Sequence, residues 1–236
     1  MPRLVLWNVD HTLVDVGRVT REAYAEAFAR VTGRPLVRLA PTAGRTESEI
    51  IFETLAFNDV VTTEDHLAEF MTALGDAFAS RRKSIRKDGR VLPGAREALA
   101  AVGRLRDVIQ SVLTGSIERN AIAKLTALGL DKYVDFEVGG YGSETYPKAA
   151  LVELARTRTA QKYGTRIAEA ATVLIADSPN DVRAAQIASA RTIAVATGNA
   201  TEAELRGAGA DVVIPTLADT DRVVRAVESL TGDGGR

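Results

Sequence analysis

The chain has 236 residues, of which 46% are hydrophobic and 26% charged, and its formal net charge is −1. This length suits one large domain, or a core domain with a smaller insert. The near-neutral charge provides no basic field to attract nucleic acid or an anionic membrane. Cysteine is absent, which excludes disulfides and thiolate zinc sites.

Two histidines are too few for a multi-histidine metal centre, so any metal site is expected to use oxygen ligands and a hard cation such as Mg²⁺. No apolar run approaches the roughly 20 residues of a membrane helix, and the N-terminal apolar stretch is too short for a signal peptide. We therefore expect a cytoplasmic protein without nucleic-acid or membrane partners.

The first predicted element is a buried strand at residues 4–7, which leads into Asn8, Asp10 and Thr12. If strand geometry continues, these three side chains project to one side, and Trp7 and His11 to the other. A carboxylate at the end of a buried strand is costly unless it binds something, and the ligand crevice of an open α/β sheet lies there. The alternative for residues 10–12 is a turn or a helix cap.

The next segment, residues 15–88, has helical patterning without a strand-like run. Apolar residues at three- and four-residue spacing, such as Ala23, Ala27 and Val31, predict a helix that ends at residues 33–35, and further helices are expected near 46–57 and 63–80. Residues 81–90 hold six basic side chains and predict a solvated linker, or alternatively a basic hinge that attracts an anionic substrate. The pattern as a whole indicates a helical insert.

From residue 91 onward, strands alternate with helices. Strands are expected at 107–113, 136–138, 172–176, 191–196 and 212–214, with a glycine-rich loop at 139–147. Repeating β-α units with short turns predict an α/β, Rossmann-like parallel sheet with helices on both faces.

A second polar cluster, Thr114-Gly115-Ser116, follows the strand at 107–113. A hydroxyl and free N–H groups at a helix N-terminus suit a phosphate group. The alternative is that Thr114 or Ser116 only caps the helix.

Two further clusters follow in the chain. Lys148 opens a helix, where a cation opposes the helix dipole. Asp177 ends a strand and Asp181 enters the first turn of the next helix, so that the two carboxylates suit an octahedral Mg²⁺. A helix cap at Ser178 or Asn180 accounts for Asp181 but not for Asp177.

The order of these motifs resembles that of the haloacid dehalogenase superfamily, in particular its phosphoglycolate-phosphatase-like members. The motifs are an Asp-x-Asp-x-Thr-like turn, Ser/Thr-Gly after a strand, a lone lysine, and Asp-Ser-Pro-x-Asp at 177–181. Residues 92–94 and 208–214 add to a likeness that covers almost the whole chain. The resemblance implies a core domain of residues 1–14 and 89–236 and a small helical cap domain of residues 15–88.

The resemblance also implies a role for each matching position. Residue 8 attacks phosphorus, and Asp10 protonates the leaving oxygen and then activates water. Thr114 and Lys148 hold the phosphoryl oxygens, with Gly115 beside them. Arg45 in the cap reads the leaving group, although a surface arginine is an equal alternative. The implied Mg²⁺ ligands are residue 8, the Asp10 carbonyl, Asp177 and Asp181.

At the critical position the chain departs from the family, because Asn8 replaces the nucleophilic aspartate. An amide is a very poor nucleophile and a weaker Mg²⁺ ligand. We expect the chain to bind a small phosphorylated metabolite and to hydrolyse it slower by several orders of magnitude. Two origins fit: an introduced substitution that traps substrate in an otherwise ordinary phosphatase, or a natural phosphate-ester-binding or regulatory protein. A phosphomutase relative is a further alternative, and the residues select neither the ester nor the oligomeric state.

Overall fold

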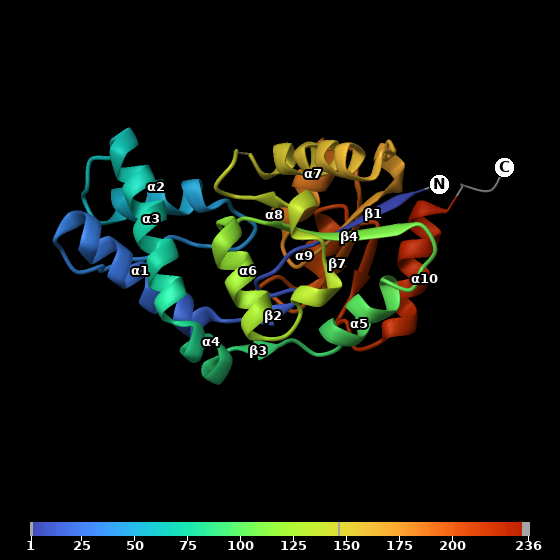
Figure 1. Ribbon diagram of the computed structural model, residues 1–236, viewed down its shortest axis with the longest axis horizontal. Coiled ribbons are helices and arrows are strands. Elements are labelled where there is room, and N and C mark those ends of the chain that lie inside the picture. Colours follow the sequence, from blue (N-terminus) through green and yellow to red (C-terminus); the bar gives the residue numbers. More distant parts are fainter. Residues whose placement is uncertain (1, 146, 233–236) are drawn as a thin grey trace.

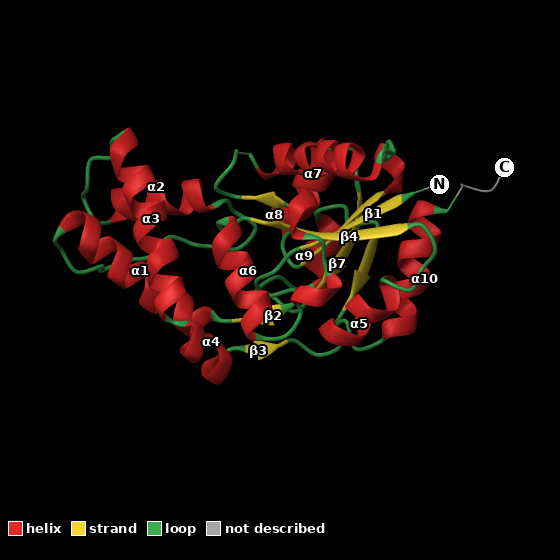
Figure 2. Cartoon of the chain, in the orientation of Figure 1, coloured by secondary structure: helices red, strands yellow, loops and turns green. Residues whose placement is uncertain are grey.

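The computed structural model describes residues 2–145 and 147–232, so that Tyr146 in the expected glycine-rich loop lies outside it. A sheet of parallel strands lies between helices at one end of the molecule, and a group of helices forms the other end (Figures 1 and 2). The strands are β1 Arg3–Trp7, β2 Val14–Asp15, β3 Arg90–Val91, β4 Val108–Thr114, β5 Gly140–Tyr141, β6 Thr172–Ala176, β7 Arg191–Val195 and β8 Val212–Ile214. The α-helices are α1 Gly17–Thr32, α2 Glu47–Phe57, α3 Glu64–Ser80, α4 Arg82–Asp88, α5 Ala95–Val102, α6 Glu118–Ala127, α7 Lys148–Tyr163, α8 Pro179–Ile187, α9 Glu202–Gly207 and α10 Thr220–Thr231. Short 3₁₀ helices lie at Asp131–Tyr133, Phe136–Val138 and Glu169–Ala171.

The main sheet has six strands in the order β5-β4-β1-β6-β7-β8, and all its pairs are parallel. Strand β1 lies near the centre, between β4 and β6. The carboxyl ends of β1, β4 and β6 therefore meet at one edge of the sheet, which brings their following loops together. The predicted α/β parallel fold is confirmed.

Both faces of the sheet are covered, as alternate side chains of β1 demonstrate. Val5 and Trp7 belong to one core cluster with residues of α5 and α10, whereas Leu4 and Leu6 belong to another with residues of α7 and α8. Because successive strand residues point to opposite faces, a strand buried on both sides must be apolar throughout. Figure 1 shows α7 on one side of the sheet and α5 and α10 on the other.

The helical segment between β2 and β3 has a hydrophobic core of its own. It is built mainly from α1, α2 and α3, and its largest buried side chains are Tyr24, Phe28, Phe70 and Phe78. The chain enters it through β2 and leaves it through β3, which pair antiparallel. The Arg90 guanidinium binds the Asp15 carboxylate at 2.6 Å across this ribbon. Both connections to the sheet are therefore adjacent in space.

Two predicted elements differ from the structure. Residues 136–138 form a 3₁₀ helix instead of a strand, because the Asp135 carboxylate accepts a hydrogen bond from the Glu137 N–H at 3.1 Å and turns the chain. The strand that pairs with β4 is instead β5, which begins two residues later, at Gly140. The predicted linker at 81–90 is mostly helix α4, which buries Ile85 in the helical core and keeps its basic side chains outside. No helix in the described ranges has the length and apolar character to cross a membrane.

Replacing Gly94 is expected to destabilise the fold. Gly94 has a φ of +79°, and an added Cβ would lie 2.2 Å from the Leu217 carbonyl carbon. Gly94→Ala should lower the free energy of unfolding by about 2–4 kcal/mol, since both the backbone and the packing are strained. Urea denaturation measures this, with Gly207→Ala, whose Cβ would meet nothing within 4 Å, as the control. Equal stability of the two variants would contradict the packing argument.

Candidate active site

The Asn8 side chain is the centre of a hydrogen-bond network at the end of β1. Its amide nitrogen donates to the Asp10 carbonyl oxygen and to Asp177 Oδ1, both at 2.9 Å. Thr12 Oγ1 donates to the same Asp177 oxygen at 2.8 Å. Asn8 is buried, and its position is fixed by a backbone bond from its N–H to the Ile175 carbonyl in β6. The ends of β1 and β6 thereby form one polar cluster.

A buried lysine completes this cluster. Lys148 Nζ donates to Asn8 Oδ1 at 3.2 Å and forms an ion pair with Asp181 Oδ1 at 2.6 Å. The other Asp181 oxygen accepts a hydrogen bond from the Ser178 hydroxyl at 2.6 Å. Ser178 also caps α8. The position of Lys148 at the start of α7, against the helix dipole, is therefore compensated by a carboxylate from α8.

The carboxyl group of Asp177 has a raised pKa. Its burial, and next the charge of the neighbouring Asp181, raise the pKa of Asp177 to about 6, against the hydrogen bonds from Thr12 and Asn8. Desolvation and a like charge both disfavour the ionised form. A strand therefore ends in a carboxylate that lacks a cationic partner among the described residues, while Asp181 has one in Lys148.

The Asp10 carboxylate points away from the Asn8 amide. It forms an ion pair with the buried Lys124 Nζ at 2.7 Å and accepts a hydrogen bond from Ser116 Oγ at 3.1 Å. Burial alone would raise the pKa of Asp10, but Lys124 and the other contacts outweigh it and hold the pKa below its usual value. Asp10 is therefore kept as a carboxylate by a cation from α6.

The expectation that residues 8, 10 and 12 share one side is wrong for the Asp10 side chain. The strand ends at Trp7, and His11 has a φ of +62°, so that strand alternation does not reach the turn. His11 consequently lines a cavity at the end of β1 together with Asn8 and Asp10, instead of pointing away from these residues. Trp7 is fully buried in the core, as expected.

The turn after β4 lies against the helical segment. The Thr114 hydroxyl accepts a hydrogen bond from the Ser116 N–H at 3.1 Å, and the cap residue of α6 is Ile117 rather than Thr114 or Ser116. A Cβ on Gly115 would lie 1.7 Å from the Arg45 carbonyl oxygen. The Gly115 carbonyl also accepts a hydrogen bond from the Glu47 N–H at 2.8 Å. Only glycine permits this close backbone approach.

The helical segment contributes an acidic group that was not predicted. Glu47 is buried at the start of α2, where it accepts hydrogen bonds from the Tyr24 hydroxyl and the Ile117 N–H. Its burial raises the pKa of Glu47, against the hydrogen bond from Tyr24. The Arg45 guanidinium is bound by the Glu53 carboxylate and by the Pro41 carbonyl. Arg45 is thus paired within its own segment.

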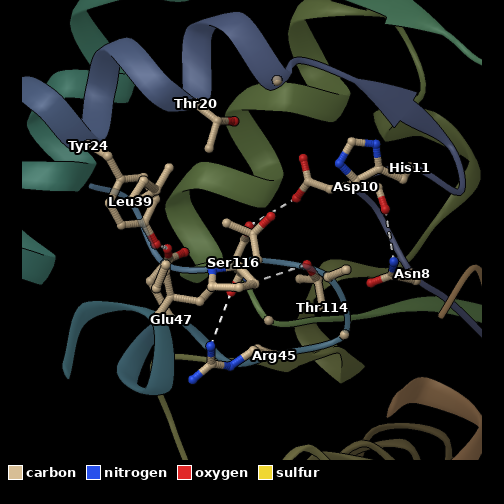
Figure 3. A pocket seen from close by; sticks show the side chains of 18 of the residues that line it. Asn8, Asp10, His11, Thr20, Tyr24, Leu39, Arg45, Glu47, Thr114 and Ser116 are labelled. Atoms are coloured by element: carbon tan, nitrogen blue, oxygen red, sulfur yellow. Dashed lines mark hydrogen bonds between the residues drawn. The ribbon is translucent and has the colours of Figure 1, made fainter. Parts of the chain in front are cut away.

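These groups surround a cavity of about 520 Å³ between the sheet edge and the helical segment (Figure 3), a size typical of small-molecule sites. The predicted residues that line it are Asn8, Asp10, Arg45, Thr114, Gly115, Lys148 and Asp177. Asp181 lies behind Lys148, in contact with its Nζ. In Figure 3, Tyr24, Leu39 and Glu47 lie across the cavity from Asn8.

The sequence does not single out Lys124 or Glu47 as site residues, and it offers Ser116 only as part of the polar cluster after β4. A signal existed for Lys124, which lies on the stripe of α6 that contains the apolar Ala121 and Leu125. A lysine on a buried helix face needs an anionic partner. Glu47 gives no such signal, since acidic residues are common in the first turn of a helix.

The motif pattern implies an Mg²⁺ ion bound by oxygen atoms at the end of β1 and β6. Asp177 and the Asp10 carbonyl are suitable oxygen donors, but both are hydrogen-bonded to the Asn8 amide nitrogen, and Asp181 is paired with Lys148. Within the described ranges, no three His, Asp or Glu side chains form a cluster suited to a metal ion. The donor set with asparagine at position 8 does not fit Mg²⁺.

The fold and site define an α/β protein with a ligand cavity at the carboxyl ends of its parallel strands. The family model for haloacid dehalogenase-like hydrolases matches residues 5–186, and the chain belongs to this family, as the sequence motifs indicated. No curated protein matches the chain.

Several solved structures share the fold. A putative beta-phosphoglucomutase from Bacteroides vulgatus superposes with a TM-score of 0.69 at 20% identity, covering 98% of this chain and 91% of its own. CbbY from Rhodobacter sphaeroides, in complex with phosphate, has a TM-score of 0.67 at 22% identity and coverages of 93% and 96%. A predicted phosphoglycolate phosphatase from Haemophilus somnus has a TM-score of 0.63 at 19% identity, and the match covers 94% of this chain and 97% of that protein. These similarities show the fold.

Removing the Lys124 ammonium group is expected to destabilise the protein. Lys124→Met leaves the Asp10 carboxylate with Ser116 as its remaining side-chain partner and should lower the free energy of unfolding by about 1–3 kcal/mol. The value is moderate because the Asp10 side chain is 30% exposed. Chemical denaturation measures the loss. The exposed Lys83 of α4 provides the matched control Lys83→Met, expected within about 0.5 kcal/mol of the unmodified chain. Equal losses would show that the Lys124 ion pair contributes nothing.

Proposed function

We propose that the chain is a phosphatase-lineage member of the family that binds a small phosphomonoester and hydrolyses it poorly because of Asn8. The observation that carries this proposal is the meeting of four separate segments at one cavity. Asn8, Thr114, Lys148 and Asp177 come from the ends of β1, β4 and β6 and the start of α7. Every expected position is filled except for the nucleophilic carboxylate.

The phosphate group is proposed to lie between Asn8, Thr114 and Lys148. The Thr114 hydroxyl and the Lys148 ammonium group are the donors that phosphate oxygens prefer, and Gly115 leaves the backbone accessible beside them. Both side chains are buried, so that their positions are fixed before the ligand arrives and little conformational entropy is lost on binding. The phosphate complex of CbbY, which shares the fold, supports an anionic ligand of this class.

The covalent step is the one that Asn8 impedes. In the proposed lineage, a carboxylate oxygen forms a bond to phosphorus while the bond to the leaving alcohol oxygen breaks, and water then cleaves the acyl phosphate. The amide oxygen of Asn8 is a far weaker nucleophile, and it is occupied by Lys148. Asp10 is the proposed proton donor to the leaving oxygen, a role that requires its carboxylate to leave Lys124 and to take up a proton before it donates one.

We also propose that residues 15–88 form a cap domain over a core of residues 1–14 and 89–236. The core cluster built mainly from this segment, which core residue Ile117 also joins, and the paired β2 and β3 at its base support a distinct unit. Leaving-group recognition is assigned to its inner side, where Arg45, Glu47 and Tyr24 line the cavity. A small phosphorylated metabolite fits this volume. Mg²⁺ is the proposed cofactor of the lineage with aspartate at position 8.

Restoring the nucleophile is the direct test. Asn8→Asp is expected to raise kcat/KM on a panel of small phosphomonoesters, assayed with Mg²⁺, by at least about 100-fold, because covalent catalysis is regained. Release of inorganic phosphate is measured for both proteins at equal concentration.

The control is Asn8→Asp combined with Asp10→Asn, which keeps the nucleophile and removes the proton donor, and which should lose about 100-fold or more of the regained rate. Equal activity of the unmodified chain and Asn8→Asp would show that residue 8 is not the nucleophile position. Absence of activity in both, across the panel, would favour a phosphate-ester-binding or regulatory protein.

A further inference from the structure

The Asn8 amide occupies the position where a cation would otherwise join the end of β1 to the end of β6. Its nitrogen lies 2.9 Å from each of two acceptor oxygens, the Asp10 carbonyl oxygen and Asp177 Oδ1, which also accepts a hydrogen bond from the Thr12 hydroxyl. A third oxygen, Thr12 Oγ1, lies at 3.4 Å. One NH₂ group with two protons therefore gathers three oxygens from the two strand ends.

The orientation of this amide follows from its partners. On its other side lies Lys148 Nζ, a donor without acceptor capacity, at 3.2 Å from Asn8 Oδ1. Rotating the amide by half a turn would place its N–H groups against the ammonium and its oxygen against a carboxylate and a carbonyl. Both contacts would then be repulsive, so the observed orientation is strongly preferred.

A divalent cation must displace this arrangement before it can bind. Its approach to Asp177 and the Asp10 carbonyl requires the amide nitrogen to leave both, and a cation cannot use the nitrogen as a ligand while it carries two protons. The third carboxylate nearby, Asp181, is bound to Lys148 and Ser178. An aspartate at position 8 would instead place a second carboxylate beside Asp177, where repulsion between them favours a cation.

We propose that Asn8 is a built-in replacement for the divalent cation, which holds the site assembled without metal and lowers its affinity for Mg²⁺ and Mn²⁺. The inference concerns the proposed active site, but its test uses no substrate. Its outcome is therefore separate from the hydrolysis assay.

Direct Mn²⁺ binding tests the proposal. Free Mn²⁺ is measured by electron paramagnetic resonance in titrations of the metal-free unmodified chain and of Asn8→Asp, and Mg²⁺ is added as a competitor. Asn8→Asp is expected to bind Mn²⁺ at least about tenfold more tightly and to release it to Mg²⁺. A difference below tenfold, or no saturable binding to a folded Asn8→Asp, overturns the proposal.

The variant Asn8→Ala distinguishes two roles of the Asn8 amide: a group that competes with the cation for its ligands, and a weak ligand of the cation itself. If the amide excludes the cation, its removal leaves the Mn²⁺ dissociation constant equal to or lower than that of the unmodified chain. If Asn8 coordinates the metal through its oxygen, Asn8→Ala binds Mn²⁺ more weakly, and the proposal is overturned. This comparison needs no folded Asn8→Asp.

Thermal unfolding gives a second readout. In excess Mn²⁺ the Tm of Asn8→Asp should rise by roughly 5 °C over its value in chelator, because ligands stabilise the state that binds them. The Tm of the unmodified chain should change by less than about 1 °C. A comparable rise in the unmodified chain overturns the proposal.

Discussion

Compensation of buried charge at the carboxyl edge of the sheet is the constraint on which this molecule depends. Asp177 and Asp181 are almost fully buried at the end of β6 and the start of α8, where an ionised group is costly without a partner. Lys148 compensates Asp181, and hydrogen bonds from Asn8 and Thr12 stabilise Asp177. These few contacts join three chain segments, so the geometry of the cavity follows from how its charges are matched.

The Lys124 side chain contacts both the sheet edge and the helical segment. Lys124 binds the Asp10 carboxylate and lies 5.0 Å from the centre of the Phe78 ring in α3. The same cation therefore contacts a site residue from the core and an aromatic side chain from the helical segment. The packing of that segment against Lys124 therefore helps to set the electrostatic environment of Asp10.

The sequence predicts the sheet well because its strands are buried on both faces and are therefore mostly apolar, as Leu4 to Trp7 in β1 and Val173 to Ala176 in β6 are. It predicts the convergence of Asp177, Lys148 and Thr114 because the carboxyl ends of parallel strands share one edge. It does not predict the direction of the Asp10 side chain, which depends on the positive φ of His11. Lys124 and Glu47 escape notice for another reason: their partners are distant in the sequence, and only the tertiary structure brings them together.

The antiparallel ribbon of β2 and β3 has a consequence for how such a protein diversifies. Because the chain leaves and rejoins the sheet at neighbouring points, the segment between Asp15 and Arg90 can change in length without changing the strand order of the six-stranded sheet. Its contacts with Gly115 and Lys124 are the points where its composition is constrained by the core. The helical segment is thus an insert whose two connections to the sheet lie next to each other. Substitutions on the side of the segment that lines the cavity, at Tyr24, Arg45 and Glu47, therefore leave the strand pairing of the sheet untouched.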